Sequence, residues 1–258
     1  MALRKRVFSE RDAVRLRVIR PAQVGPSHNE KFFYYGKVTF QRPQDPAHTT
    51  VTRPVFLRYF GEDEQAEQAA QRQMKMRKRL ETLGLPVPKA GIVRIADPQN
   101  PRKRLVYLAV QSFLRKRTSQ SRLIPINNSS KGIVPSANPN FLAKLTASKD
   151  KGVIQQLAKD LAKIVSFGLR IGTSLDIFGF YRQQDGSWKY VVMDVEDIYD
   201  AKKHVKSPEE MRLSNRNACN ALFQQIIPVW PANSPEFKLF EKEFVKKLPP
   251  ELKGFQLD

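Results

Sequence analysis

Apolar and polar residues alternate with a period of two along much of the first 115 residues. Residues 13–20 read AVRLRVIR, residues 32–40 read FFYYGKVTF and residues 53–60 read RPVFLRYF. A period of two buries one set of side chains, so each stretch predicts a β-strand. Two more predicted strands, residues 90–96 and 104–114, are separated by the turn sequence DPQNPRK. The front of the chain is therefore expected to form a sheet.

A helix is predicted after the third of these strands. Residues 61–83 form a polar run with acidic residues at positions 62–64 and basic residues concentrated at positions 75–79. Acids near the start and bases near the end suit the helix dipole, and Gly84 ends the run. The second half of the chain is mostly helical in pattern: residues 153–169 are amphipathic.

Two further helices are predicted near the end of the chain. The first begins near Ser207, a good capping residue, and the second covers residues 235–248, where phenylalanines recur at helical spacing. Between the strand-rich and the helical halves, residues 116–140 are rich in Ser, Asn and Pro. This composition is typical of an exposed connection.

Carboxylates lie at both ends of a predicted β-hairpin within residues 168–200. Asp176 precedes the first strand, Asp194 ends the second, and Glu196 and Asp197 follow at once. Strand ends bring such side chains together, and Mg²⁺ prefers hard oxygen ligands, so the pattern is typical of a metal site. The alternative interpretation is that these acids cap strands and lie in a solvated loop.

The formal net charge is +20 and is unevenly distributed, because residues 1–150 carry 29 Lys and Arg against 11 Asp and Glu. The triplet Arg-Lys-Arg occurs four times in this half. We expect a polyanion as partner, which could be nucleic acid, an anionic membrane surface or an acidic protein. A basic surface without a dedicated partner is the alternative. The residues predicted to bind the polyanion are Arg77, Lys78, Arg79, Arg102, Lys103, Arg104, Arg115, Lys116 and Arg117.

A single cysteine, Cys219, excludes an internal disulfide framework and fits a reducing compartment. No apolar run is long enough to cross a bilayer, and no signal peptide is visible. The sequence therefore predicts an intracellular protein.

The order of elements resembles the protein-kinase-like fold, more closely its aminoglycoside and choline phosphotransferase branch than the eukaryotic protein kinases. VFLRYF resembles the third strand of the small lobe, and YVVMDVEDI looks like the strand and metal-binding motif of these phosphotransferases. The resemblance implies an α+β, two-lobe protein in which an antiparallel-sheet small lobe precedes a mainly helical lobe. The expected divisions are a basic small lobe at 1–113, a hinge and exposed loop at 114–140, and a helical lobe at 141–258.

The resemblance also implies Mg²⁺ and ATP as cofactors if the chain is active. Arg58 would then hold the phosphates in place of the family's lysine, with Glu64 or Glu67 as its helix partner. Asp176 would be the catalytic base or a second metal ligand, and Asp194 and Glu196 would hold the metal.

The match to this family is incomplete in three places. Arg58 replaces the lysine, Tyr181 falls at the position of the metal-binding Asn when Asp176 is aligned as the catalytic Asp, and no glycine-rich loop covers the phosphates. Two interpretations follow. The chain is either a divergent phosphotransferase or a pseudokinase that keeps the fold as a binding platform.

Two hypotheses from other classes remain open. The hairpin also resembles that of the PD-(D/E)xK nucleases, with Asp176 and Asp194 as the two acids and Asp160 as the helix acid, although Glu196 stands where lysine is needed. The other hypothesis is a non-catalytic nucleic-acid-binding or assembly protein, which would use the basic triplets and exposed aromatics.

Overall fold

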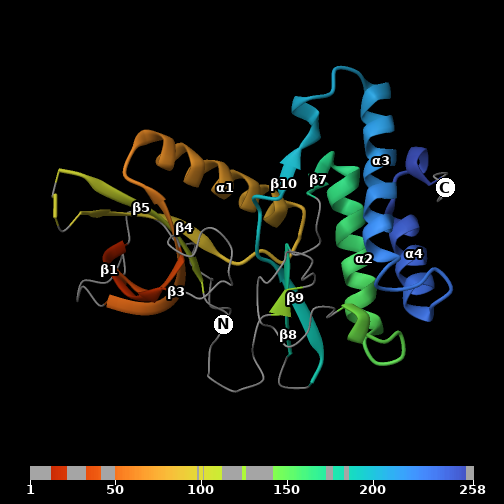
Figure 1. Cartoon of the computed structure of the whole chain (residues 1–258), viewed down its shortest axis with the longest axis horizontal. Coiled ribbons are helices and arrows are strands. Elements are labelled where there is room, and N and C mark those ends of the chain that lie inside the picture. The colour runs from red at the N-terminus through yellow and green to blue at the C-terminus, as the bar shows by residue number, and fades with distance from the viewer. Residues whose placement is uncertain are drawn as a thin grey trace, which may run out of the picture. The chain divides into compact units, whose positions relative to one another are not determined.

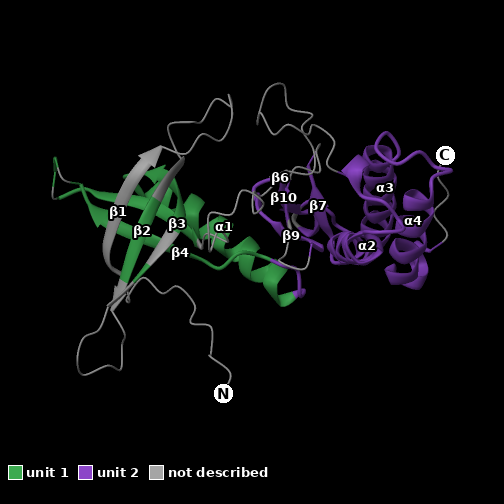
Figure 2. Ribbon diagram, turned by 90° about the horizontal axis from the view of Figure 1, so that it is seen from below, with its two compact units in different colours: residues 1–82, 87–117, 132–134 green, residues 83–86, 118–131, 135–258 purple. Residues whose placement is uncertain are grey.

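The structure is a computed structural model that describes residues 13–21, 33–41, 50–97, 99–100, 102–111, 124–125, 142–172, 177–182 and 186–253. The chain forms two compact units (Figure 2). Unit 1 contains residues 1–82, 87–117 and 132–134, and unit 2 contains residues 83–86, 118–131 and 135–258.

Unit 1 is built on a five-stranded antiparallel sheet with the order β1-β2-β3-β5-β4 (Figure 1). Its strands are β1 (Ala13–Pro21), β2 (Phe33–Gln41), β3 (Thr50–Gly61), β4 (Ala90–Ala96) and β5 (Arg104–Gln111). All five strands that the sequence predicts for the first half of the chain are therefore present.

Helix α1 (Glu64–Thr82) packs on one face of this sheet. Ala66 and Ala70 of the helix form a buried cluster with Ile92, Val106 and Leu108 of the strands. The opposite face has its own buried cluster, which consists of Val38, Val55, Leu57, Val93, Tyr107 and Ala109. The two clusters come from alternate residues of the same strands, as a period of two requires.

Gly61 makes the junction between β3 and α1 possible. Its φ is +139°, which L side chains rarely adopt, and a Cβ on it would lie 3.0 Å from the Cβ of Ala66. A side chain at this position would therefore strain the backbone and crowd the first turn of α1.

Unit 2 combines three longer helices with short strands. The helices are α2 (Lys151–Ser166), α3 (Pro208–Ile226) and α4 (Pro235–Lys247), and the short 3-10 helices are η3 (Leu142–Lys144), η4 (Ala201–Lys203) and η5 (Pro250–Leu252). The strands are β6 (Ile124–Pro125), β7 (Leu169–Ile171), β8 (Phe178–Arg182), β9 (Trp188–Val192) and β10 (Ile198–Asp200). They pair as the sheets β10-β7 and β6-β8-β9.

Serine caps begin both C-terminal helices. Ser207 Oγ accepts a hydrogen bond from the Glu210 N–H (3.1 Å), and Ser234 Oγ accepts one from the Phe237 N–H (3.1 Å). The phenylalanine side chains whose spacing predicted the last helix are buried against α3. Edge-to-face ring contacts join Phe223 of α3 to Phe237, Phe240 and Phe244 of α4.

The α+β fold class is confirmed, with a sheet-based unit followed in sequence by a mainly helical one. The expected hinge and loop, residues 114–140, lies outside the described residues apart from the short strand β6. Strand β9 ends at Val192, two residues earlier than expected, so Asp194 follows the hairpin. Within the described residues, no helix is long and apolar enough to cross a membrane.

Candidate functional site

Arg58 lies on β3, the strand expected to present the phosphate-holding residue. Its neighbours Val55 and Leu57 belong to the cluster on the sheet face opposite α1, whereas Phe60 packs in the cluster beneath α1. Arg58 therefore shares the α1 side of the sheet with Phe60, and its guanidinium carbon lies 5.0 Å from the centre of the Phe60 ring. The side chain is partly buried.

The carboxylate of Glu67 is bound by Arg94 of β4. Glu67 Oε2 accepts a hydrogen bond from Arg94 Nε at 2.7 Å, and Oε1 accepts one from Arg94 Nη2 and another from Gln71 Nε2 at 2.8 Å. The hydrogen bond from Arg94 is the main reason that the pKa of Glu67 is lowered. The pairing expected for Glu67 was with Arg58, and in the structure both of its oxygens are occupied by other residues.

Sequence reasoning missed Arg94, although a signal for it existed. Arg94 is two residues after Ile92, which faces α1, so the strand period places Arg94 on the same face. Position alone could not show which acid of α1 it meets.

The acids after the hairpin are exposed. Asp194 and Glu196 have exposed side chains, and Asp194 Oδ1 accepts a hydrogen bond from the backbone N–H of Glu196 at 3.0 Å. This contact closes a local turn, which is the capping role described above as the alternative interpretation. The candidate catalytic residue Asp176 lies outside the described residues.

The described acids do not form a complete Mg²⁺ site. Among the described residues, no group of three or more His, Cys, Asp or Glu side chains is arranged to hold a metal ion. Mg²⁺ needs several oxygen ligands in near-octahedral geometry, and Asp194 and Glu196 together do not supply them. No chemical step through Mg²⁺ and ATP is therefore derived from this geometry.

Asp160, the helix acid of the nuclease hypothesis, is completely buried. Its Oδ2 accepts a hydrogen bond from the Tyr190 hydroxyl at 2.7 Å, and its Oδ1 accepts bonds from Gln156 Nε2 and Lys163 Nζ, both at 3.1 Å. Burial and the nearby Asp160 carboxylate raise the pKa of Tyr190. Asp160 thus joins α2 to β9 inside the core and has no access to a phosphodiester.

The basic triplets differ in how far they reach solvent. Lys78 is exposed and Arg79 is partly buried, but Arg77 of the same triplet is buried, with only 7% of its surface accessible. Arg77 therefore does not present its guanidinium at the surface as expected. Arg102, Lys103 and Arg104 are exposed, whereas the triplet Arg115, Lys116 and Arg117 lies outside the described residues.

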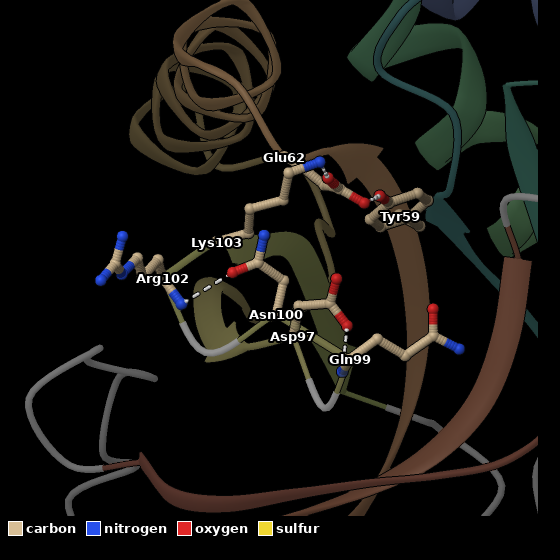
Figure 3. Close-up of polar contacts among 7 residues, drawn as sticks. All are labelled: Tyr59, Glu62, Asp97, Gln99, Asn100, Arg102 and Lys103. Carbon is tan, nitrogen blue, oxygen red and sulfur yellow. Dashed lines mark hydrogen bonds and ion pairs between the residues drawn. The ribbon is translucent and has the colours of Figure 1, made fainter.

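The turn between β4 and β5 carries the triplet of residues 102–104 on a hydrogen-bonded loop (Figure 3). Asp97 Oδ1 accepts a bond from the Gln99 N–H (2.9 Å), and Asn100 Oδ1 accepts one from the Arg102 N–H (3.2 Å). The Arg102 side chain extends away from this loop, so its charge is presented to solvent.

Lys103 is partly neutralised by Glu62 next to α1. Lys103 Nζ lies 2.8 Å from Glu62 Oε2, while the Tyr59 hydroxyl donates to Glu62 Oε1 at 3.3 Å (Figure 3). Burial, together with the Glu62 carboxylate, raises the pKa of Tyr59 to about 12. Of this triplet, Arg102 and Arg104 are thus the more available to an external anion.

Five antiparallel strands, one helix between the third and the fourth, and a following helical unit form the layout that the resemblance implies. The layout is protein-kinase-like. No protein-family model and no curated protein sequence matches the chain.

The solved structures that are similar to this chain include two that cover most of its length. One is WaaP in complex with acyl carrier protein, at 12% identity and a TM-score of 0.41, covering 91% of this chain and 79% of the other. The second is the Helicobacter pylori proinflammatory kinase CtkA, at 9% identity and a TM-score of 0.44, covering 92% of this chain and 81% of the other. At these scores the likeness carries no inference about chemistry, and the description of the fold rests on the chain's own topology.

Proposed function

We propose that this chain is a kinase-like binding protein that does not transfer phosphoryl groups and that engages an extended polyanion through unit 1. The observation that carries the proposal is the pairing of Glu67 with Arg94. Phosphoryl transfer depends on cations and metal ions positioned around the phosphates. Here Glu67, one of the two helix acids expected to orient the cation of the third strand, is bound to a residue of the fourth.

The arrangement of the acids after the hairpin supports the same proposal. Asp194 and Glu196 are exposed and share a local turn, and no described cluster of acids completes a Mg²⁺ site. Among the described residues, a complete set of metal ligands and a cation of β3 oriented by Glu67 are both missing, and phosphoryl transfer depends on such groups for charge stabilisation.

The positive charge of unit 1 favours an extended partner over a single phosphate group. Exposed bases lie in the second half of α1, including Lys75 and Lys78, and others lie on the β4–β5 turn, including Arg102 and Arg104. That turn is tied through Lys103 to Glu62, just before α1 begins. At 1.5 Å per residue, Lys78 lies about 20 Å further along the helix. A nucleic acid strand can span this distance with several phosphates.

Salt-dependent binding of labelled single- and double-stranded nucleic acid tests this proposal. We expect the double substitution Lys75→Glu/Lys78→Glu to weaken binding by at least about tenfold and to reduce the slope of log K against log salt, by roughly 0.7 to 0.9 for each lost phosphate contact. The matched control is Lys242→Glu/Lys246→Glu on α4 of unit 2, which makes the same change in net charge. Equal weakening by both variants would show attraction to net charge alone and contradict a site on unit 1.

Thermal unfolding with ATP, with and without Mg²⁺ or Mn²⁺, tests the absence of phosphoryl transfer. We expect no metal-dependent increase in the unfolding temperature, either for the wild type or for Asp194→Ala. A metal-dependent increase that Asp194→Ala abolishes would contradict the proposal and favour a divergent phosphotransferase. Metal-dependent cleavage of the labelled nucleic acid would instead favour the nuclease hypothesis.

A further inference from the structure

Unit 2 contains a cavity of about 410 Å³ among β7, β10, α2 and α3. Pockets of this size are typical of small-molecule sites. Its wall is largely apolar and includes Val165, Ile171, Leu213, Ala218, Ala221 and Leu222. The acids of the hairpin, Asp194 and Glu196, do not line it, so the cavity is separate from the candidate site described above.

A buried cation, Arg170, faces this cavity. Only 6% of its surface is accessible. Its Nη1 donates to the Leu169 carbonyl oxygen (2.9 Å), and its Nη2 donates to Ser214 Oγ and Asn215 Oδ1, both at 2.7 Å. All of these acceptors are neutral, and within the described part of the chain no carboxylate forms a direct ion pair with the guanidinium, although the charge of Asp200 is near enough to favour its protonated form.

A buried charge without a counter-ion is costly, because protein oxygens replace water only in part. Burial accordingly lowers the pKa of the Arg170 guanidinium. Glu210 is an acid that lines the cavity, but its side chain is exposed, and its Oε2 accepts a hydrogen bond from the Lys206 N–H. An anion that entered the cavity would supply the direct ion pair that Arg170 does not make with Asp200.

Gln225 adds a second polar group that faces the cavity without a full set of partners. Its Nε2 donates to the Gly172 carbonyl oxygen at 3.5 Å. Its Oε1 is buried and accepts no hydrogen bond from any described residue. A buried acceptor left in this state favours a ligand with an N–H or O–H group.

Large apolar side chains are exposed around the cavity. Tyr199 is 51% exposed and Leu213 is 59% exposed, and both contribute to its lining. Such residues leave water when an apolar ligand covers them, which favours binding by about 25 cal/mol for each Å² buried.

We propose that this cavity binds a small organic carboxylate that has an apolar body and an N–H group. Its carboxylate pairs with Arg170, its N–H donates to Gln225 Oε1, and its apolar part packs against Ile171, Leu213 and Tyr199. This inference goes beyond the proposed function, since it uses neither unit 1 nor the acids of the hairpin.

A pair of small probes that differ only in charge tests the proposal. N-acetyl-L-phenylalanine carries the carboxylate, and N-acetyl-L-phenylalaninamide replaces it with a neutral amide of the same shape. Titration calorimetry and ligand-observed NMR on the full chain give both affinities. We expect the carboxylate to bind at least ten times more tightly than the amide, and we expect Arg170→Met to remove this preference.

A second variant tests the location without touching the buried cation. Ala221 is exposed on α3 and lines the cavity, so Ala221→Phe fills the space while its helix remains intact. Gln224→Phe is the matched control, because Gln224 is exposed on the same helix and does not line the cavity. We expect Ala221→Phe to abolish binding and Gln224→Phe to preserve it.

Several results would overturn the proposal. They are equal affinities for the two probes, no binding of the carboxylate at millimolar concentration, or undiminished binding to Ala221→Phe. Near-ultraviolet circular dichroism checks that each variant is folded. If Arg170→Met fails to fold, the comparison of Ala221→Phe with Gln224→Phe still decides the outcome.

Discussion

The substitution Tyr190→Phe removes one hydroxyl group from the core of unit 2. That hydroxyl is the only described donor to Oδ2 of Asp160, at 2.7 Å, and Asp160 has no exposed surface. The other carboxylate oxygen, Oδ1, keeps its hydrogen bonds from Gln156 and Lys163. The substitution therefore leaves one half of a buried carboxylate without a partner while the ring packing stays in place.

The expected cost follows from the loss of a hydrogen bond to a charged group in a buried site. Such bonds contribute about 1.5–3 kcal/mol, and an unsatisfied buried acceptor adds to the loss. We expect the free energy of unfolding to fall by about 2–3 kcal/mol. For domains of roughly 150–250 residues this lowers the unfolding temperature by about 5–10 °C.

Denaturant unfolding followed by circular dichroism measures this change. Tyr199→Phe is the matched control, because Tyr199 is 51% exposed and its substitution should change stability by no more than about 0.5 kcal/mol. A double-mutant cycle with Asp160→Asn should give a coupling energy of at least about 1 kcal/mol. A cost for Tyr190→Phe below about 0.5 kcal/mol, or additive effects in the cycle, would refute the reasoning.

Three other predictions concern the helices and their contacts. Because the hydrogen bond from Arg94 lowers the pKa of Glu67, this pair stabilises the fold above the unfolded-state pKa of Glu67, and that stability is lost as the pH falls. Arg94→Met should therefore reduce the loss of stability that acid titration measures below about pH 4.5. An acid transition that is unchanged in Arg94→Met would contradict this prediction. Ser234→Ala should lower the free energy of unfolding by about 1 kcal/mol in denaturant titrations, since it removes the cap of α4, whereas Ser148→Ala, an exposed control, should not. Burial raises the pKa of the Cys219 thiol to about 12, so a thiol reagent should modify it only in denaturant, and rapid modification of the folded chain at pH 8 would contradict this.

Periodicity predicted most of the elements of this fold. The alternation in β3 predicted a strand with one buried face, and the structure buries side chains on both faces of the sheet. Helix α4 was predicted from phenylalanine spacing, and its rings pack against Phe223 as expected. Such patterns can be read from sequence because they are local. A strand with one buried face buries every second side chain, and a helix buries side chains three or four positions apart.

The candidate site was predictable only in part. Asp194 was expected to end the second strand of the hairpin, but β9 ends at Val192, and the Asp194 carboxylate closes a local turn with Glu196, a geometry that spacing does not reveal. The pairing of Glu67 was predicted with Arg58 and observed with Arg94, which is 27 residues further along the chain. Sequence spacing identifies the charges on a face, but the partner depends on the order of strands in the sheet.

The sequence by itself determined the strand and helix segments, the excess of positive charge in the first half and the single cysteine, because these are properties of composition and local period. Tertiary structure alone decided which charges are available. Consecutive residues of an α-helix point about 100° apart, so the triplet at positions 77–79 could not present all three cations on one face. Packing against the sheet buries Arg77 and leaves Lys78 exposed, and the same kind of long-range packing places Arg170 beside a cavity with only neutral hydrogen-bond acceptors.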